Sequence, residues 1–145
     1  MRHTFLFQPA VWEARGHYVD RSGASVEVVG DATITHEDAG WVNRSLMRPV
    51  DPGGQAFESS YAVRPFEQGA DTTTWTSSSA QLGKMSGQFV LVADSILSIG
   101  RAADGRYRSV EYLQQLAEDR YVSRGALLRG RDKVSSWAVE LRRIR

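Results

Sequence analysis

Apolar and polar residues alternate with a period of two along most of this chain, above all in the stretch that follows Phe66. In that stretch no window of roughly 11–18 residues places apolar residues at helical spacing. Alternation is typical of β-strands, because successive side chains of a strand point to opposite faces. The last proline is Pro65, and proline is excluded from central strands because it has no N–H for the ladder. The proline-free run therefore predicts one continuous antiparallel sheet.

Turn-forming residues divide the alternating chain into segments. Asp104-Gly105 is the strongest hairpin signal, because this pair favours the two-residue turns that match the twist of paired strands. Pro49 and Pro52 lie in a longer predicted loop, which we expect at the rim of the fold. We predict ten strands, mostly in up-and-down order, over residues 11–19, 25–36, 41–48, 57–66, 72–81, 88–93, 95–102, 106–116, 120–128 and 136–144.

Four shorter stretches carry expectations of their own. Residues 83–87 and 130–133 contain glycine among polar residues, which predicts turns. Residues 112–119 are the stretch where a helical turn is the alternative to a strand. The residues before Pro9 are expected to form a short cap.

Ten strands in 145 residues predict an all-β fold of one domain, over residues 1–145. We expect the sheet to close on itself as a single up-and-down antiparallel β-barrel. Several predicted strands, such as residues 72–81 and 106–116, have no consistently apolar face, which a packed sandwich would need. A wide barrel explains them, because its interior can mix apolar walls with polar groups that orient a ligand. The alternative is a thinner fold in which these strands lie on the surface.

The composition excludes some chemistry and leaves the charge open to two interpretations. The chain has no cysteine, which removes thiol catalysis and cysteine-ligated metal sites. Net charge is +1, but residues 1–100 hold 7 basic and 11 acidic side chains, whereas residues 101–145 hold 11 basic and 6 acidic ones. One interpretation of the abundant arginine is a GC-rich bacterial genome. The other is that arginines on the last strands line a site for an anion, which the guanidinium fork matches.

Nothing near the N-terminus indicates export or a membrane anchor. Only three apolar residues, 5–7, precede Gln8-Pro9, which is fewer than the roughly 7–15 of a signal-peptide core. No apolar run reaches the ~20 residues that span a bilayer. We expect a soluble cytoplasmic protein whose partner is a small molecule, with no nucleic-acid or membrane partner. A homodimer through an open sheet edge is a further alternative.

Residues 10–18 contain Trp12 and resemble the opening strand of calycin barrels, the superfamily of lipocalins, fatty-acid-binding proteins and avidins. The resemblance implies a lipocalin-like barrel in which this tryptophan plugs the closed end and packs against an arginine from the last strands. Ala10 stands where the lipocalin signature has glycine. The candidate partners of Trp12 are Arg129, Arg131, Arg142 and Arg143.

Within the calycins, Trp12, Gly16 and Tyr18 resemble the first strand of the ten-stranded nitrobindin-like group. That group holds haem through a histidine in the C-terminal part of the chain. The histidines of this chain are His3, His17 and His36. We therefore expect no haem and no other cofactor.

Catalytic and metal-binding motifs are missing from the sequence. The three histidines lack the spacing of a metal site, and the serines lack the context of a nucleophile elbow. His17 could act as an acid or base if it points into the barrel, and the alternative is that it is exposed. We predict no catalytic residue and no metal site.

The function that the sequence favours is binding of a small amphipathic or hydrophobic ligand inside the barrel, by a carrier or sensor. Arg108, Val110 and Tyr112 share one strand face, and an apolar wall with guanidinium groups suits a ligand with an anionic head. The alternative is that these rows face solvent. Other open functions are a barrel enzyme, such as an isomerase or cyclase, and a structural or protein-interaction barrel. The predicted ligand-binding residues are Arg108, Tyr112, Arg120, Arg124, Tyr61 and Trp75.

Overall fold

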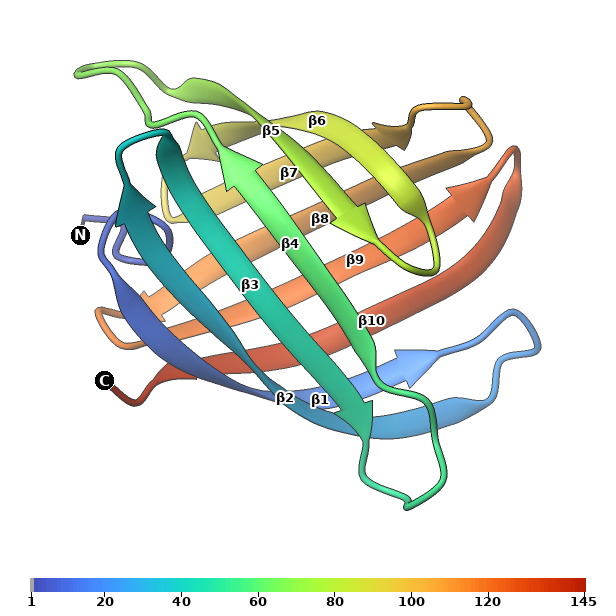
Figure 1. Ribbon diagram of the computed structural model, residues 1–145. Helices are drawn as coiled ribbons and strands as arrows, with labels where there is room; N and C mark the ends of the chain where they lie inside the picture. The colour runs from blue at the N-terminus through green and yellow to red at the C-terminus, as the bar shows by residue number, and fades with distance from the viewer. Residues whose placement is uncertain (1) are drawn as a thin grey trace.

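The computed structural model describes residues 2–145 as ten antiparallel strands joined by turns (Figure 1). Each strand pairs with its neighbours in sequence, and the first also pairs with the last, so the sheet closes. The prediction of an all-β, up-and-down barrel is confirmed. The strands are β1 (Ala10–Val19), β2 (Ser25–Glu37), β3 (Gly40–Pro49), β4 (Phe57–Val63), β5 (Thr72–Ser79), β6 (Gly83–Val92), β7 (Ser95–Ala102), β8 (Tyr107–Ala117), β9 (Arg120–Arg129) and β10 (Asp132–Arg143).

Closure depends on the pairing of β1 with β10, which runs from Trp12 opposite Arg143 to Val19 opposite Ser136. A closed barrel has no strand edge with unpaired backbone groups. Among residues 2–145, the open edge on which the homodimer alternative depended is therefore missing. The described chain holds no helix with the length and apolar character needed to cross a bilayer.

Three strand boundaries differ from those predicted by three residues or more. β4 ends at Val63, before Pro65, which cannot donate to a ladder. The turn expected over residues 83–87 is wrong, because β6 already begins at Gly83. The turn expected over 130–133 is shorter, since β10 begins at Asp132. β8 continues to Ala117, so residues 112–117 form strand rather than a helical turn.

One end of the barrel is closed by the N-terminal segment, which curls across it in Figure 1. Phe5 and Leu6 are buried there beside Trp12, which is fully buried. The Tyr121 hydroxyl accepts hydrogen bonds from the backbone N–H groups of Thr4 and Phe5, at 3.0 and 3.3 Å. The cap expected before Pro9 is thus confirmed as a plug of the closed end.

Trp12 also makes the arginine contact that the resemblance implied. The guanidinium of Arg143 lies 5.9 Å from the centre of the Trp12 ring, close enough for a cation–π interaction. Arg143 is therefore the partner among the four candidate arginines. The largest fully buried side chains, Trp12, Tyr121 and Leu6 among them, lie at this end, and the apolar core continues to Met85, Ala102 and Leu127 near the other end.

Candidate ligand-binding site

The strand register decides which predicted binding residues face the interior. Tyr61 and Trp75 point inward, because they pair with inward-facing Asn43 and Val63. The other four lie on the outer face and are exposed: Arg108, Tyr112, Arg120 and Arg124. The expectation that these arginines line the interior is therefore wrong, although no observation tests whether they bind a ligand from outside.

The sequence did not predict which face of β8 is turned inward, because both faces of this strand mix polar and apolar residues. Buried Ile96 on β7 is paired with Leu113 and buried Ser98 with Glu111, so that row of β8 faces inward. The row with Arg108 is then turned out, since adjacent residues of a strand point to opposite faces.

Glu111 is the central polar residue of the interior. Its Oε2 accepts a hydrogen bond from Ser123 Oγ and another from Trp137 Nε1, both at 2.8 Å. Protein surrounds this carboxyl, yet Glu111 remains partly accessible to a water-sized molecule, so space inside the barrel reaches it. Both hydrogen bonds that residues 2–145 make to this carboxylate end on Oε2, which leaves Oε1 available to a ligand.

Burial raises the pKa of the Glu111 carboxyl above its usual value, because desolvation disfavours its charged form. The hydrogen bonds from Ser123 and Trp137 act in the opposite direction, since they favour the carboxylate. Burial and the nearby Glu111 charge raise the pKa of Tyr18 to about 12. The same two causes raise the pKa of Tyr61. Two neutral phenols and one carboxyl thus face one another inside the barrel.

A glycine makes the contact between Trp137 and Glu111 possible. Gly125 on β9 is paired with Glu111 on one side and with Trp137 on the other. A Cβ on Gly125 would lie 2.3 Å from Trp137 Cζ2, far inside van der Waals contact. The indole can therefore cross β9 to reach the carboxylate.

Trp75 is accommodated in the same way on the other side of the interior. Trp75 is paired with Gly87 of β6, and Gly87 is paired in turn with Gly100 of β7. A Cβ on either glycine would lie 2.5 Å from the indole. Two indoles thus lie against glycine-bearing strands, which keeps their bulk at the wall of the barrel.

Four buried polar atoms of the described residues have no hydrogen-bond partner. Trp12 Nε1 and Gln115 Oε1 lie at the closed end, and the other two are Asn43 Oδ1 and Trp75 Nε1. Buried polar atoms of native proteins are nearly always paired, so such orphans call for an explanation. All four atoms are closed off from solvent in this structure.

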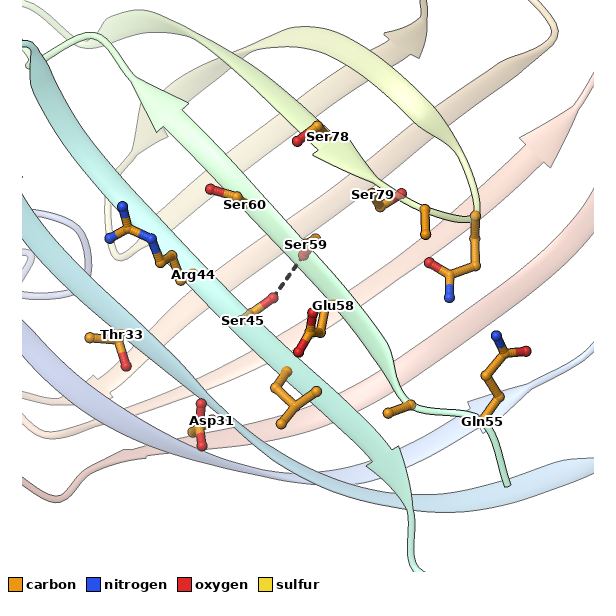
Figure 2. A pocket seen from close by; sticks show the side chains of 14 residues that line it. Asp31, Thr33, Arg44, Ser45, Gln55, Glu58, Ser59, Ser60, Ser78 and Ser79 are labelled. Atoms are coloured by element: carbon orange, nitrogen blue, oxygen red, sulfur yellow. Dashed lines mark hydrogen bonds between the residues drawn. The ribbon is translucent and has the colours of Figure 1, made fainter. Parts of the chain in front are cut away.

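The open end has a hollow of about 880 Å³, shown in Figure 2. It lies where β4 and β5 diverge, between the loop with Gln55 and the turn with Gln81. Its lining combines outward-facing residues such as Glu58 with inward-facing ones such as Ser59, which is hydrogen-bonded to Ser45 at 2.8 Å. The hollow therefore touches both faces of the sheet.

The three histidines lie away from Glu111. His3 and His36 hold the closed end, through hydrogen bonds to the Tyr121 hydroxyl and to the Leu6 carbonyl. His17 is exposed on the outer face, so the acid–base role considered for it inside the barrel is wrong. Within residues 2–145 no group of three or more histidine, aspartate or glutamate side chains could hold a metal ion.

Sequence reasoning missed Glu111, Ser123 and Trp137 as a site. The available signal was a glycine inside a predicted strand, which often marks a place where another group approaches closely. Gly125 carried that signal, but the sequence does not show which side chain crosses it.

Comparison with known proteins supports the fold. No protein-family model matches the chain, and no curated protein sequence matches it with significance. The structure of the S-type phycobiliprotein lyase CPES from Guillardia theta matches with a TM-score of 0.70 and 11% identity, covering 97% of this chain and 91% of that one. The likeness agrees with the calycin-like barrel that the first strand predicted. At this identity the likeness concerns the fold alone.

A second structure, a Nitrosomonas europaea protein provisionally assigned as AttH, matches with 12% identity over 94% of this chain and 51% of that one. This chain spans about half of that protein's length. Its TM-score of 0.31 is too low to support an argument.

Proposed function

We propose that this barrel binds a small molecule with a flat apolar body and an N–H donor, which hydrogen-bonds to Glu111 inside the barrel. The observation that carries the proposal is the Glu111 carboxylate, fixed by Ser123 and Trp137 through Oε2, with Oε1 unused. Pockets for small molecules are mostly apolar and contain a few polar groups that orient the ligand.

The charge of the site favours a cationic or neutral donor over the anionic head that the sequence favoured. An anion beside a desolvated carboxylate is repelled, whereas a cation or N–H group is attracted. The arginines that motivated an anionic ligand lie on the outer face instead.

The aromatic residues around Glu111 suit a flat ligand body. Tyr18 and Trp137 lie with ring centres 6.1 Å apart, and Tyr61 lies 5.2 Å from Trp75. Such rings offer faces for stacking and edges for T-shaped contacts. Ser59, which lines the hollow at the open end, lies two residues from Tyr61 on β4, and this is the side from which we propose that the ligand enters.

The test begins with native mass spectrometry of freshly purified protein, to detect mass that denaturation removes. Thermal unfolding is then followed with a matched series that shares one flat body: tryptamine, tryptophol and indole-3-acetate. We expect the amine to stabilise the protein most, and its binding to strengthen as pH rises through the folded pKa of Glu111. The Glu111→Gln variant should lose the preference for the amine.

Glu140→Gln is the matched control, because Glu140 lies exposed on the outer face of β10. This variant should behave like the wild type. Stronger stabilisation by the carboxylate than by the amine, or an unchanged amine preference in Glu111→Gln, would contradict the proposal.

A further inference from the structure

One outer face of the barrel carries most of the exposed large apolar side chains of the described residues. Of the eight exposed large apolar side chains, five lie on β6, β7 or β8: Val92, Ile99, Val110, Tyr112 and Leu116. Ile99 is 50% exposed, Val110 45% and Tyr112 39%. Apolar side chains gathered in this way commonly mark an interaction site.

The register makes the centre of this face continuous. Ile99 lies opposite Val110, and Leu97 lies opposite Tyr112 on the next pair of the same face. We call these four residues the apolar outer patch. Cross-strand neighbours on one face are about 5 Å apart, so the four side chains form a single surface.

The charges around the apolar outer patch have one sign. Arg101 and Arg108 face each other across β7 and β8, beside the pair of Ile99 with Val110. On β6–β9 the outward-facing charged residues are Lys84, Arg101, Arg108, Arg120 and Arg124, and no carboxylate faces outward on these described strands. Acidic residues lie in the connecting turns, at Asp94, Asp104, Glu118 and Asp119, and on β10, where Glu140 is paired with Val122 of β9.

From these features we infer that the apolar outer patch docks a partner protein whose contact surface is apolar at its centre and acidic at its rim. Protein interfaces have an apolar core enriched in Tyr and Arg and a polar rim. Complementary charge speeds the encounter of two such surfaces and excludes partners of the wrong sign.

A second copy of the chain fits this face poorly. A two-fold dimer sets the same patch against itself, which would oppose Arg101 and Arg108 to their own copies. A bilayer also fits less well, because the wall of a barrel is convex and meets a plane along a narrow strip. A protein surface can follow that curvature.

The test uses a synthetic amphipathic helix with a leucine face flanked by glutamates, and a twin with lysine at each glutamate position. Amide chemical shifts of the full chain are recorded during titration. We expect the acidic helix to shift resonances of Ile99, Val110 and Tyr112. The Tyr112→Ser variant and the Arg101→Glu, Arg108→Glu pair should each weaken binding about tenfold or more.

The matched control is the pair Arg44→Glu and Arg48→Glu on the outer face of β3, which makes the same charge change elsewhere and should leave binding unchanged. All these positions are exposed, and a circular dichroism melt verifies that each variant folds. Equal binding of the lysine twin, shifts confined to other strands, or no binding would overturn the inference. Preferential binding to phosphatidylserine vesicles, or self-association lost in Tyr112→Ser, would assign the face to a membrane or to a second copy instead.

Discussion

Single residues set the chemistry of the barrel interior. Glu111 brings a carboxyl into a desolvated space, where Ser123 and Trp137 stabilise its charged form. Two of the surrounding groups are phenols whose pKa values rise because of burial and the same carboxylate. Ionisation of Glu111 thus affects both the stability of the fold and the charge of the barrel interior.

The first prediction concerns stability against pH. Burial raises the folded pKa of Glu111, so the folded protein keeps this proton to a higher pH than the unfolded chain does. The stability linked to this proton is fully present below the unfolded pKa and is lost as pH rises through the folded value. We expect Glu111→Gln, which cannot ionise, to gain stability relative to the wild type as pH rises from the unfolded pKa of glutamate, about 4.3, through the folded value.

Guanidinium unfolding at several pH values measures this difference, with Glu140→Gln as the exposed control. If Glu111→Gln instead lost stability relative to the wild type on raising the pH, the hydrogen bonds to the carboxylate would outweigh its burial.

A second prediction concerns Gly125, over which Trp137 reaches Glu111. A methyl group there would meet the Trp137 ring at 2.3 Å and the Val110 carbonyl oxygen at 2.8 Å. We expect Gly125→Ala to displace the indole and to lower the free energy of unfolding by about 1–3 kcal/mol, as overpacking does. Tryptophan fluorescence and denaturant unfolding measure both effects.

The control for this change is Ala126→Ser, one residue further on the outer face, which should alter unfolding by less than about 0.5 kcal/mol. An unchanged emission spectrum in Gly125→Ala would mean that the indole position does not depend on the glycine.

At the scale of elements, the N-terminal segment and the open end differ in how firmly they are held. The N-terminal segment is tied to β9 through Tyr121, whose hydroxyl contacts three residues of the plug, His3, Thr4 and Phe5. By contrast, β4 and β5 share only five residue pairs beside the hollow at the open end. The barrel is therefore sealed at one end, and its shortest strand pairing, between β4 and β5, lies beside the hollow at the other.

The third prediction tests the seal. Tyr121→Phe keeps the ring against Trp12 and Phe5 but leaves the N–H groups of Thr4 and Phe5 without their acceptor. We expect a loss of about 1–3 kcal/mol, the usual result of leaving a buried donor unsatisfied. Amide exchange at Thr4 and Phe5 should speed up more than exchange in β9.

Tyr112→Phe removes a hydroxyl from the outer face and serves as the control, because that side chain is exposed. Equal protection of Thr4 and Phe5 in both variants would show that the plug does not rely on the Tyr121 hydroxyl.

For the whole molecule, closure is the feature on which everything inside depends. Arg145 lies beside the start of β1 at the closed end, where its carbonyl accepts a hydrogen bond of 2.7 Å from the Val11 N–H. β10 supplies Trp137 to the site and Arg143 to Trp12, and it pairs on both sides. The proposed site and the closed end therefore both depend on the last strand.

The fourth prediction follows from this closure. A chain shortened by residues 132–145 should lose cooperative thermal unfolding and the near-ultraviolet signal of its tryptophans, because β1 and β9 lose their common partner. A circular permutant that joins the natural ends and opens the exposed loop at residues 50–56 keeps every strand and should retain both properties. Cooperative unfolding of the shortened chain would show that the barrel does not need closure.

The sequence by itself determined the strands and their order, because alternation, turn residues and proline exclusion act over a few neighbouring positions. Trp12 at the closed end also followed from the first strand, whose resemblance to calycin barrels the structure confirms in Arg143. The tertiary structure alone decided which side of each strand faces inward. In β8 the row with Arg108, Val110 and Tyr112 and the row with Glu111 and Leu113 are both mixed, so hydrophobicity does not choose between them. Pairing with β7 and β9 decides which row faces inward. It turns Arg108 outward and brings Glu111 within hydrogen-bond distance of Trp137.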